Sequence, residues 1–337
     1  MGEERELQLL TNSKRSCFLK CPRKYCLRYE KCRAPIREAK ALSLGKLVHS
    51  ALEFLWGNEA PAAVPLAGEW PGIEMFYYAL SDAEADTAIQ YDIFKAIAMM
   101  EGYSQRYDGD NYETIAVEAE YRAPLLNPDT GKPSRTWVLA GKIDAIAKDR
   151  DGKIIIVEHK TTSDSVAPES KYWRKLTIDG QVSGYLVGAA ALGYKPAYCL
   201  YDVLAKPKHE PKMATPEDGR KYTKDGKLYA KQRETDETPD EYGERVFGEI
   251  MKTPEKYYGR RDIVRLESEI ESYSRDMWAI GLMIRACQLG NSWPHNGNAC
   301  TEFGGCEYFE VCAGFANIND DTLFATVEPN PELSGGK

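Results

Sequence analysis

The feature that most constrains this chain is a short apolar run, residues 153–160, that ends abruptly in charge. It reads Lys-Ile-Ile-Ile-Val-Glu-His-Lys. β-Branched residues favour strands, and a continuous apolar run is typical of a strand buried on both faces. Such a strand lies in the middle of its sheet. We therefore expect the charged side chains of Glu158 and Lys160 at a strand end that opens into a site.

The segments around this run predict further strands and then a helix. Residues 115–121 alternate apolar and polar side chains, and residues 137–147 form a second strand-like segment after the turn residues of 127–133. Residues 181–192 return to a helical pattern. Strands mixed with helices in a chain of 337 residues predict an α/β fold with a substantial core.

Asp144 is placed to join the charges at the end of residues 153–160. Alternate side chains of a strand share a face, so Glu158 and Lys160 project together. An even-sum pairing register would bring Asp144 onto that face. Two close carboxylates repel one another, and Mg²⁺ or Mn²⁺ relieves that repulsion, while a lysine can orient water. The alternative is a surface ladder of salt bridges, which the preceding apolar run disfavours.

Basic residues are concentrated in residues 11–40, although the whole chain is acidic. The chain has 44 Lys and Arg against 52 Asp and Glu, a net charge of −8. Residues 11–40 hold ten basic and two acidic residues with interleaved aromatic rings, a combination suited to tracking phosphates. An ordinary solvated helix face is the alternative. The candidates for nucleic-acid contact are Lys14, Arg15, Arg23 and Lys24.

The sequence carries no pattern of export or of a membrane span. Residues 3–6 are charged where a signal peptide would start. No apolar run approaches the roughly 18 residues of a membrane helix. We therefore expect a cytoplasmic protein with no membrane contact.

The nine cysteines suggest a metal centre rather than disulfides. The count is odd, and a reducing cytoplasm disfavours stable disulfides. Four cysteines lie near the start of the chain and three near its end. This distribution predicts that the two ends of the chain meet.

The order of several short motifs resembles the PD-(D/E)XK nuclease superfamily. Asp144 within Gly-Lys-Ile-Asp, followed by Glu158-x-Lys160, is similar to the superfamily core. Residues 45–49, Gly-Lys-Leu-Val-His, resemble the GxxxH motif of the RecB-like branch, and residues 181–185, Gln-Val-Ser-Gly-Tyr, resemble its QxxxY motif. The resemblance implies a restriction-endonuclease-like α/β core, with a mixed central sheet flanked by helices.

The resemblance also implies roles for individual residues. His49, Asp144 and Glu158 would be metal ligands, joined by the backbone carbonyl of His159, and Lys160 would be the catalytic lysine. Gln181 and Tyr185, one helical turn apart, would contact the substrate strand near the scissile phosphate.

Iron–sulfur members of this branch, including AddB-type helicase-nucleases and CRISPR-adaptation exonucleases, join one N-terminal cysteine to three near the C-terminus. Cys21 here resembles the N-terminal element, and Cys300, Cys306 and Cys312 resemble the closing trio. The interval from Cys300 to Cys306 is longer than is common in the family. Four thiolates can hold a [4Fe–4S] cluster or a structural Zn²⁺ ion. The rival N-terminal ligands are Cys17, Cys26 and Cys32.

The resemblance predicts a single RecB-like nuclease domain over residues 1–320, with a flexible tail at 321–337. Its parts are the basic segment 11–40, the catalytic core 114–192, an exposed mobile insertion at 206–249 and a cluster-binding segment at 300–312, which clasps the two ends of the chain together.

We expect a metal-dependent DNA exonuclease of bacteriophage type, acting on DNA ends or single strands in recombination, repair or phage DNA processing. A recombinase or single-strand annealing protein is the expected partner. The alternatives are a structure-specific or single-strand endonuclease and a catalytically silent iron–sulfur DNA-binding scaffold.

Overall fold

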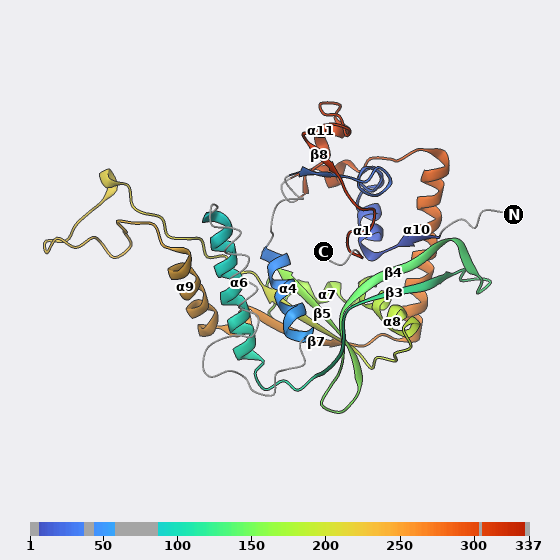
Figure 1. The fold of residues 1–337 in the computed structure, drawn as a ribbon, viewed down its shortest axis with the longest axis horizontal. Coiled ribbons are helices and arrows are strands. Elements are labelled where there is room, and N and C mark those ends of the chain that lie inside the picture. The colour runs from blue at the N-terminus through green and yellow to red at the C-terminus, as the bar shows by residue number, and fades with distance from the viewer. Residues whose placement is uncertain (1–6, 37–43, 58–86, 303–304, 334–337) are drawn as a thin grey trace.

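The centre of the fold is a six-stranded mixed sheet (Figure 1). The structure is a computed structural model that describes residues 7–36, 44–57, 87–302 and 305–333. The strand order is β1-β4-β5-β6-β7, and β3 also pairs with β4. The pairs β1–β4 and β5–β6 are parallel and the others are antiparallel. The strands are β1 (Gln8–Leu10), β3 (Glu113–Leu126), β4 (Pro133–Lys148), β5 (Ile154–Thr162), β6 (Cys199–Ala205) and β7 (Tyr258–Ile263).

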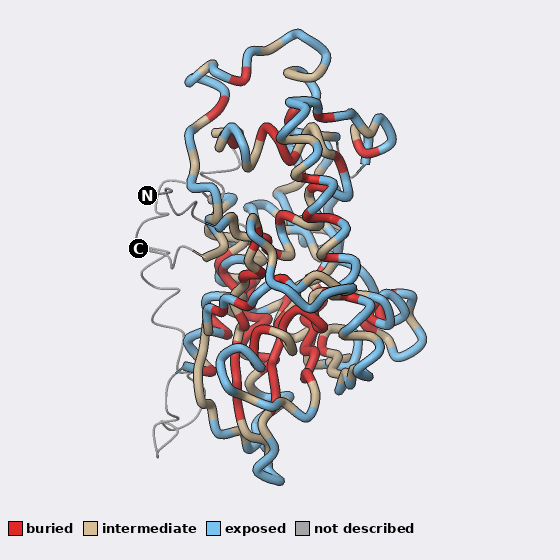
Figure 2. The backbone as a smooth tube through the Cα atoms, turned by 90° about the vertical axis from the view of Figure 1, so that its right-hand side faces the viewer, coloured by how far each residue is buried: buried red, intermediate tan, exposed pale blue. Residues whose placement is uncertain are grey.

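Helices cover both faces of this sheet, so the predicted α/β architecture is confirmed. Helix α8 (Gly180–Ala191) buries Val182 and Ala189 with the side chains of one face. Helix α4 (Leu44–Gly57) packs Trp56 against the opposite face, beside Val157 of β5. Figure 2 shows the buried residues gathered in the body that contains the sheet. The remaining longer helices are α6 (Thr87–Arg106), α9 (Pro239–Lys252) and α10 (Glu267–Gly290), with the short α7 (Lys171–Lys175).

The close approach of β3 to β4 depends on a missing side chain at Gly141. The Tyr121 ring lies over this glycine, and a methyl group added there would meet the Tyr121 hydroxyl at 2.6 Å. Tyr121 is itself buried, with 6% of its surface exposed, and packs among the apolar residues beneath α8. The glycine of the Gly-Lys-Ile-Asp segment therefore makes room for an aromatic ring three residues before Asp144.

The two ends of the described chain meet, as the distribution of cysteines predicted. Strand β2 (Arg33–Pro35) pairs antiparallel with β8 (Phe324–Thr326). Arg33 donates to the Ile318 carbonyl at 3.0 Å and to the Phe324 carbonyl at 2.7 Å. The prediction of a flexible tail from residue 321 is therefore wrong for this segment, because β8 is paired and the Phe324 ring is buried. Residues 334–337 lie outside the described ranges.

The short elements at the two ends complete this region. They are α1 (Asn12–Lys20), α2 (Pro22–Tyr25), the π-helical turn η1 (Cys26–Glu30), the 3-10 turn η4 (Gly297–Cys300) and α11 (Phe309–Cys312). The last four residues of the predicted basic segment 11–40 lie outside the described ranges.

The predicted exposed insertion at 206–249 is shorter than expected. Its last part belongs to α9, whose side chains Tyr242, Val246 and Ile250 are fully buried against α6 and α4. These residues recur every four positions and so form one apolar helix face. The irregular part of the segment ends at Thr238, the N-cap of α9, and contains the 3-10 turn η2 (Glu217–Gly219) and an isolated bridge between Tyr222 and Leu228. A second 3-10 turn, η3 (Pro254–Lys256), follows α9.

No helix in the described part of the chain combines the length and the apolar character needed to cross a bilayer.

Candidate active site

The pairing of β4 with β5 sets the geometry of the candidate site. The strands are antiparallel, with Ala145 opposite Val157 and Ile146 opposite Ile156. This is the even-sum register that the sequence analysis required, and its continuation places Asp144 across from Glu158. The backbone N–H of His159 donates to Asp144 Oδ2 at 2.9 Å. The two carboxylates therefore lie on neighbouring strands at the same level of the sheet.

Glu158 is an acidic residue whose surroundings disfavour its charged form. Its side chain is 0% exposed, and its carboxylate meets the Lys160 ammonium and the Tyr185 hydroxyl. Burial, reinforced by the nearby Asp144 charge, raises the pKa of Glu158 to about 8. Removing a carboxylate from water disfavours its ionised form, and a second carboxylate adds repulsion. The site thus holds a buried carboxyl group that a cation would stabilise.

Lys160 supplies one such cation. Its ammonium forms an ion pair with Glu158 Oε1, and its side chain is 30% exposed. Burial acts to lower the pKa of Lys160, but the Glu158 and Asp144 carboxylates outweigh it, so the pKa is raised. Lys160 is therefore positively charged, and it contacts Glu158, one of the candidate metal ligands.

His49 lies on α4, close enough for the Asp144 and Lys160 charges to act on it. The helix is amphipathic and buries Leu47, Val48 and Ala51 beside it, which fixes the direction of the histidine. Burial lowers the pKa of His49 to about 4, although the nearby Asp144 opposes the shift. Its imidazole is therefore neutral at pH 7, which is the form that binds a metal ion.

The residues present suit a divalent cation of the Mg²⁺ or Mn²⁺ type. A fully buried carboxyl group, a second carboxylate and a neutral imidazole form an oxygen-rich donor set. Within the described ranges, no three His, Cys, Asp or Glu side chains converge closely enough to hold an ion as they stand. The ammonium of Lys160 contacts Glu158 and neutralises it instead.

Behind the site, the His159 side chain enters a polar network that the sequence analysis missed. His159 Nδ1 lies 3.4 Å from Asp202 Oδ2, and Asp202 Oδ1 lies 3.1 Å from Arg260 Nε. Tyr103 donates to Asp202 Oδ2 at 2.5 Å. Burial acts to raise the pKa of Asp202, but Arg260 and His159 hold it below its ordinary value. The available sequence signal was an aspartate within the apolar strand Cys-Leu-Tyr-Asp-Val-Leu-Ala.

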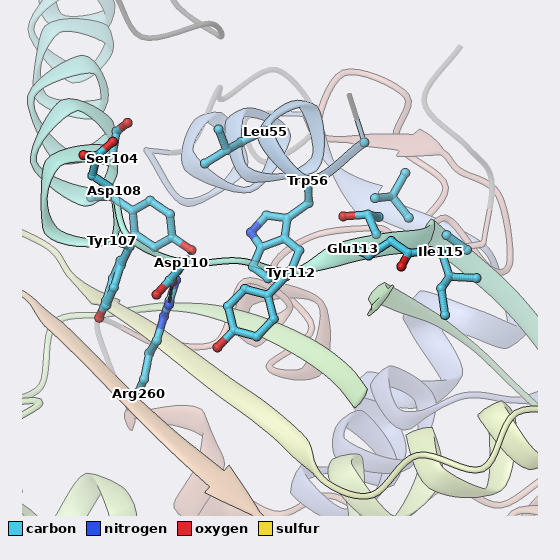
Figure 3. A pocket seen from close by; sticks show the side chains of 15 residues that line it. Leu55, Trp56, Ser104, Tyr107, Asp108, Asp110, Tyr112, Glu113, Ile115 and Arg260 are labelled. Atoms are coloured by element: carbon cyan, nitrogen blue, oxygen red, sulfur yellow. Dashed lines mark hydrogen bonds and ion pairs between the residues drawn. The ribbon is translucent and has the colours of Figure 1, made fainter. Parts of the chain in front are cut away.

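A cavity of about 800 Å³ opens beside this network (Figure 3). Arg260 stacks 3.4 Å from the centre of the Tyr107 ring and also contacts Asp110. Trp56 lies between Tyr112 and His159, with ring centroids 5.4 and 5.5 Å away. Because His159 and Glu158 are consecutive in a strand, this cavity is on the opposite face of the sheet from the carboxylates.

Gln181 and Tyr185 lie on one face of α8, as predicted. Gln181 Nε2 donates to the Tyr185 hydroxyl at 2.6 Å, and this hydroxyl lies beside Glu158. Tyr185 is 6% exposed, so its ring packs in the core. The Arg15 guanidinium lies against Gly180 at the start of α8.

Three basic residues of the N-terminal segment contact protein groups. Lys14 is buried and donates to the Leu9 carbonyl at 3.1 Å, a placement that does not support a phosphate contact. Arg23 donates to the Trp293 carbonyl at 2.9 Å. Lys24 pairs with Glu307 at 2.6 Å. These contacts tie the N-terminal segment to the C-terminal one.

Cys21, Cys300, Cys306 and Cys312 line a single cavity of about 220 Å³. The rival cysteines Cys17, Cys26 and Cys32 are not among the described residues that line it. Burial raises the pKa of the Cys306 and Cys312 thiols. A single Zn²⁺ ion would need sulfur atoms about 3.8 Å apart, given Zn–S bonds of about 2.3 Å, and no such convergence is present in the described chain.

Comparisons with known proteins identify the family of this chain. A family model described as the PD-(D/E)XK nuclease superfamily matches residues 10–313. No curated protein matches. Among solved structures, the chain is similar to one titled "Crystal structure of SSO0001", with 15% sequence identity and a TM-score of 0.26 over 69% of this chain and 73% of that chain. That TM-score is too low to carry an argument. The family match covers most of the chain, so this protein belongs to the PD-(D/E)XK nuclease superfamily.

Proposed function

We propose that this protein is a metal-dependent DNA exonuclease. The observation that supports the proposal most is the buried Glu158 carboxyl group at the end of β5, with Asp144 on the neighbouring strand and Lys160 in ion-pair contact. Burial of a carboxylate costs free energy even when one cation pairs with it, and a second carboxylate nearby adds to that cost. In a phosphodiesterase, this carboxylate would serve as a metal ligand.

His49, Asp144, Glu158 and the His159 carbonyl would hold Mg²⁺ or Mn²⁺. The bound ion would polarise a phosphoryl oxygen and activate water for attack. Asp144 also accepts a hydrogen bond from the backbone N–H of His159. This bond fixes the backbone of His159, whose carbonyl is a proposed ligand. Lys160 would orient the attacking water and stabilise negative charge on the phosphate. Gln181, held by its bond to the Tyr185 hydroxyl, would contact the substrate strand, together with Arg15 of α1, which lies against the start of α8.

A [4Fe–4S] cluster held by Cys21, Cys300, Cys306 and Cys312 would clasp the ends of the chain. The single cavity that these four residues line supports the assignment of Cys21 rather than a rival N-terminal cysteine. The pairing of β2 with β8 brings the same two segments together. The role proposed for the cluster is structural, because the cavity is formed by segments outside the catalytic strands. Structural zinc is the alternative cofactor.

The exonucleolytic mode and the biological setting rest on the resemblance to AddB-type and CRISPR-adaptation exonucleases. In that reading the protein degrades DNA from its ends during recombination, repair or phage DNA processing. A recombinase or single-strand annealing protein would act on the resulting strands.

The test is the dependence of cleavage on DNA ends. Wild-type protein with Mg²⁺ or Mn²⁺ should release nucleotides from end-labelled linear DNA and leave a covalently closed circle of the same sequence intact. Asp144→Ala should abolish release, whereas the control Asp151→Ala, in the exposed turn before β5, should not. Equal cleavage of the circle would indicate the endonuclease alternative. Undiminished cleavage by a folded Asp144→Ala protein would refute the site.

A further inference from the structure

An extended arm, residues 206–238, connects β6 to α9. Figure 1 shows it reaching away from the body of the molecule beyond α9. Its first residue lies at the edge of the sheet that carries the candidate site, since the Lys206 N–H donates to the Thr162 carbonyl at 2.7 Å. Thr162 is the last residue of β5 and lies two residues after Lys160. The arm therefore starts at the mouth of the site.

The base of the arm is fixed to α9 by a buried ion pair. Glu237 is 2% exposed, and Arg245 donates to both of its carboxylate oxygens at 2.7 Å. The Lys212 N–H donates to the same carboxylate at 2.8 Å, so one side chain joins the outgoing and returning strands of the arm. Tyr242 adds a bond to the His209 carbonyl at 2.7 Å. These contacts hold the direction in which the arm projects.

The tip of the arm, residues 219–233, is a small hairpin closed by its own hydrogen bonds. Tyr222 and Leu228 form an antiparallel bridge, and the Tyr229 N–H donates to the Lys221 carbonyl at 3.0 Å. Gly226 makes the turn with a φ of 73°. The tip thus keeps a defined shape although it packs on no apolar core.

The tip carries a positive charge that its own surroundings do not neutralise. It contains six basic residues and one acidic residue, in a protein whose net charge is −8. Four exposed lysines form no ion pair with any residue that the structure describes. Two tyrosine rings beside them are about half exposed. These residues are Lys221, Lys224, Lys227, Lys231, Tyr222 and Tyr229.

We propose that the tip of the arm binds the phosphate backbone of the DNA whose end lies in the catalytic site, an inference that rests on the proposed nuclease function. Unpaired lysines on a defined hairpin suit repeated phosphate groups, and the exposed tyrosine rings suit stacking on unpaired bases. An acidic protein would also attract this charge, but the arm begins at the mouth of the site, where the DNA must pass. The tip therefore holds the DNA at a distance from the bond that is cut.

The test removes the four lysine charges and measures the salt dependence of DNA binding. The variant is Lys221→Gln, Lys224→Gln, Lys227→Gln and Lys231→Gln in the full chain. The matched control, Lys148→Gln, Arg150→Gln, Lys153→Gln and Lys195→Gln, removes the same charge from turns at the opposite end of β5 and β6. Binding of a fluorescent duplex of about 40 base pairs is followed by anisotropy in EDTA, which prevents cleavage. Unchanged thermal unfolding of both variants shows that they fold.

Each phosphate contact adds about 0.9 to the slope of log affinity against log salt, so loss of four contacts should lower the slope by about 3.6. The affinity advantage of wild type over the arm variant should then shrink roughly 100-fold between about 50 and 200 mM salt. The control should keep the wild-type slope. A duplex of about 8 base pairs, roughly 27 Å long, should bind wild type and arm variant alike.

The outcomes separate this inference from the proposed function. If wild type cleaves DNA but the arm variant keeps the wild-type slope, the arm inference is wrong and the nuclease proposal stands. If the arm variant loses about 3.6 in slope relative to wild type but wild type cleaves no DNA with Mg²⁺ or Mn²⁺, the nuclease proposal fails and the arm inference is upheld as DNA binding. Equal losses in the arm variant and the control would also overturn the inference, because the effect would then be one of total charge.

Discussion

Replacement of Glu158 by glutamine is expected to stabilise the metal-free protein at neutral pH while removing a proposed metal ligand. Glu158 is fully buried, and the Asp144 carboxylate lies nearby on the neighbouring strand. Glutamine has nearly the same shape without the charge. Lys160 would lose its ion-pair partner, but its side chain is 30% exposed and can be hydrated.

The magnitude follows from the pKa of Glu158, which burial and Asp144 raise from 4.5 to about 8. A folded state that holds a proton more tightly than the unfolded chain gains stability at low pH. This contribution is fully present below pH 4.5 and is lost as the pH rises towards about 8. Each pH unit in that window corresponds to about 1.4 kcal/mol. Between pH 4.5 and pH 7 the free energy of unfolding of wild type should therefore fall by about 3 kcal/mol because of Glu158. The Glu158→Gln variant has no group that titrates at this position, so it should not show this fall.

The assay is urea unfolding followed by tryptophan fluorescence in EDTA at pH 4.5 and pH 7. The free energy of unfolding of Glu158→Gln minus that of wild type should increase by about 3 kcal/mol between the two pH values. The control Glu120→Gln, an exposed glutamate on β3, should show no such change. Saturating Mg²⁺ should stabilise wild type more than the variant. A difference that does not change with pH would refute the assignment of Glu158 as a destabilised buried charge.

Other predictions concern the fold and the cysteine cavity. Gly141→Ala should destabilise the protein by about 1–3 kcal/mol through overlap with the Tyr121 ring, and urea unfolding would measure it; an unchanged midpoint would contradict the packing. Arg245 lowers the pKa of Glu237, so Glu237→Gln should lower the free energy of unfolding by about 2 kcal/mol at pH 7. The loss should become smaller as the pH falls through that lowered pKa. Thermal unfolding at several pH values would measure the trend, and a loss independent of pH would contradict it. Cys306→Ala should remove visible iron–thiolate absorption from anaerobically purified protein and lower its stability, whereas stoichiometric zinc without iron in wild type would decide for the zinc alternative.

The sequence was sufficient to predict the strands of the candidate site because their pattern is local. A continuous apolar run that ends at Glu158 and Lys160 defines both a central strand and the end at which a site opens. Asp144 shares a face with Glu158 only if opposed residues of β4 and β5 have an even sum. The β4–β5 pairing has this register. Local periodicity, and the requirement that Asp144 and Glu158 share one face of the sheet, were enough to predict this part of the fold.

Long-range contacts were not predictable in the same way. Asp202 and Arg260 lie on different strands, and only the sheet order brings them to His159. Lys14 belongs to a basic segment whose composition suggested an exposed face, but a carbonyl partner turns it inward. The tail after residue 321 is polar in sequence and yet is ordered by Arg33, nearly 300 residues earlier. A single sequence carries no record of such pairings.

The central claim is that Lys160 acts on water at a metal site held by Asp144 and Glu158, and single-turnover hydrolysis of end-labelled DNA in saturating Mn²⁺ tests it most directly. Lys160→Ala should slow hydrolysis by between about 10²- and 10⁴-fold, the range typical of a positioned catalytic group, while calorimetry shows Mn²⁺ binding retained. Lys153→Ala, at the other end of the same strand, should hydrolyse DNA at the wild-type rate. Wild-type hydrolysis by a folded, metal-bound Lys160→Ala protein would contradict the claim.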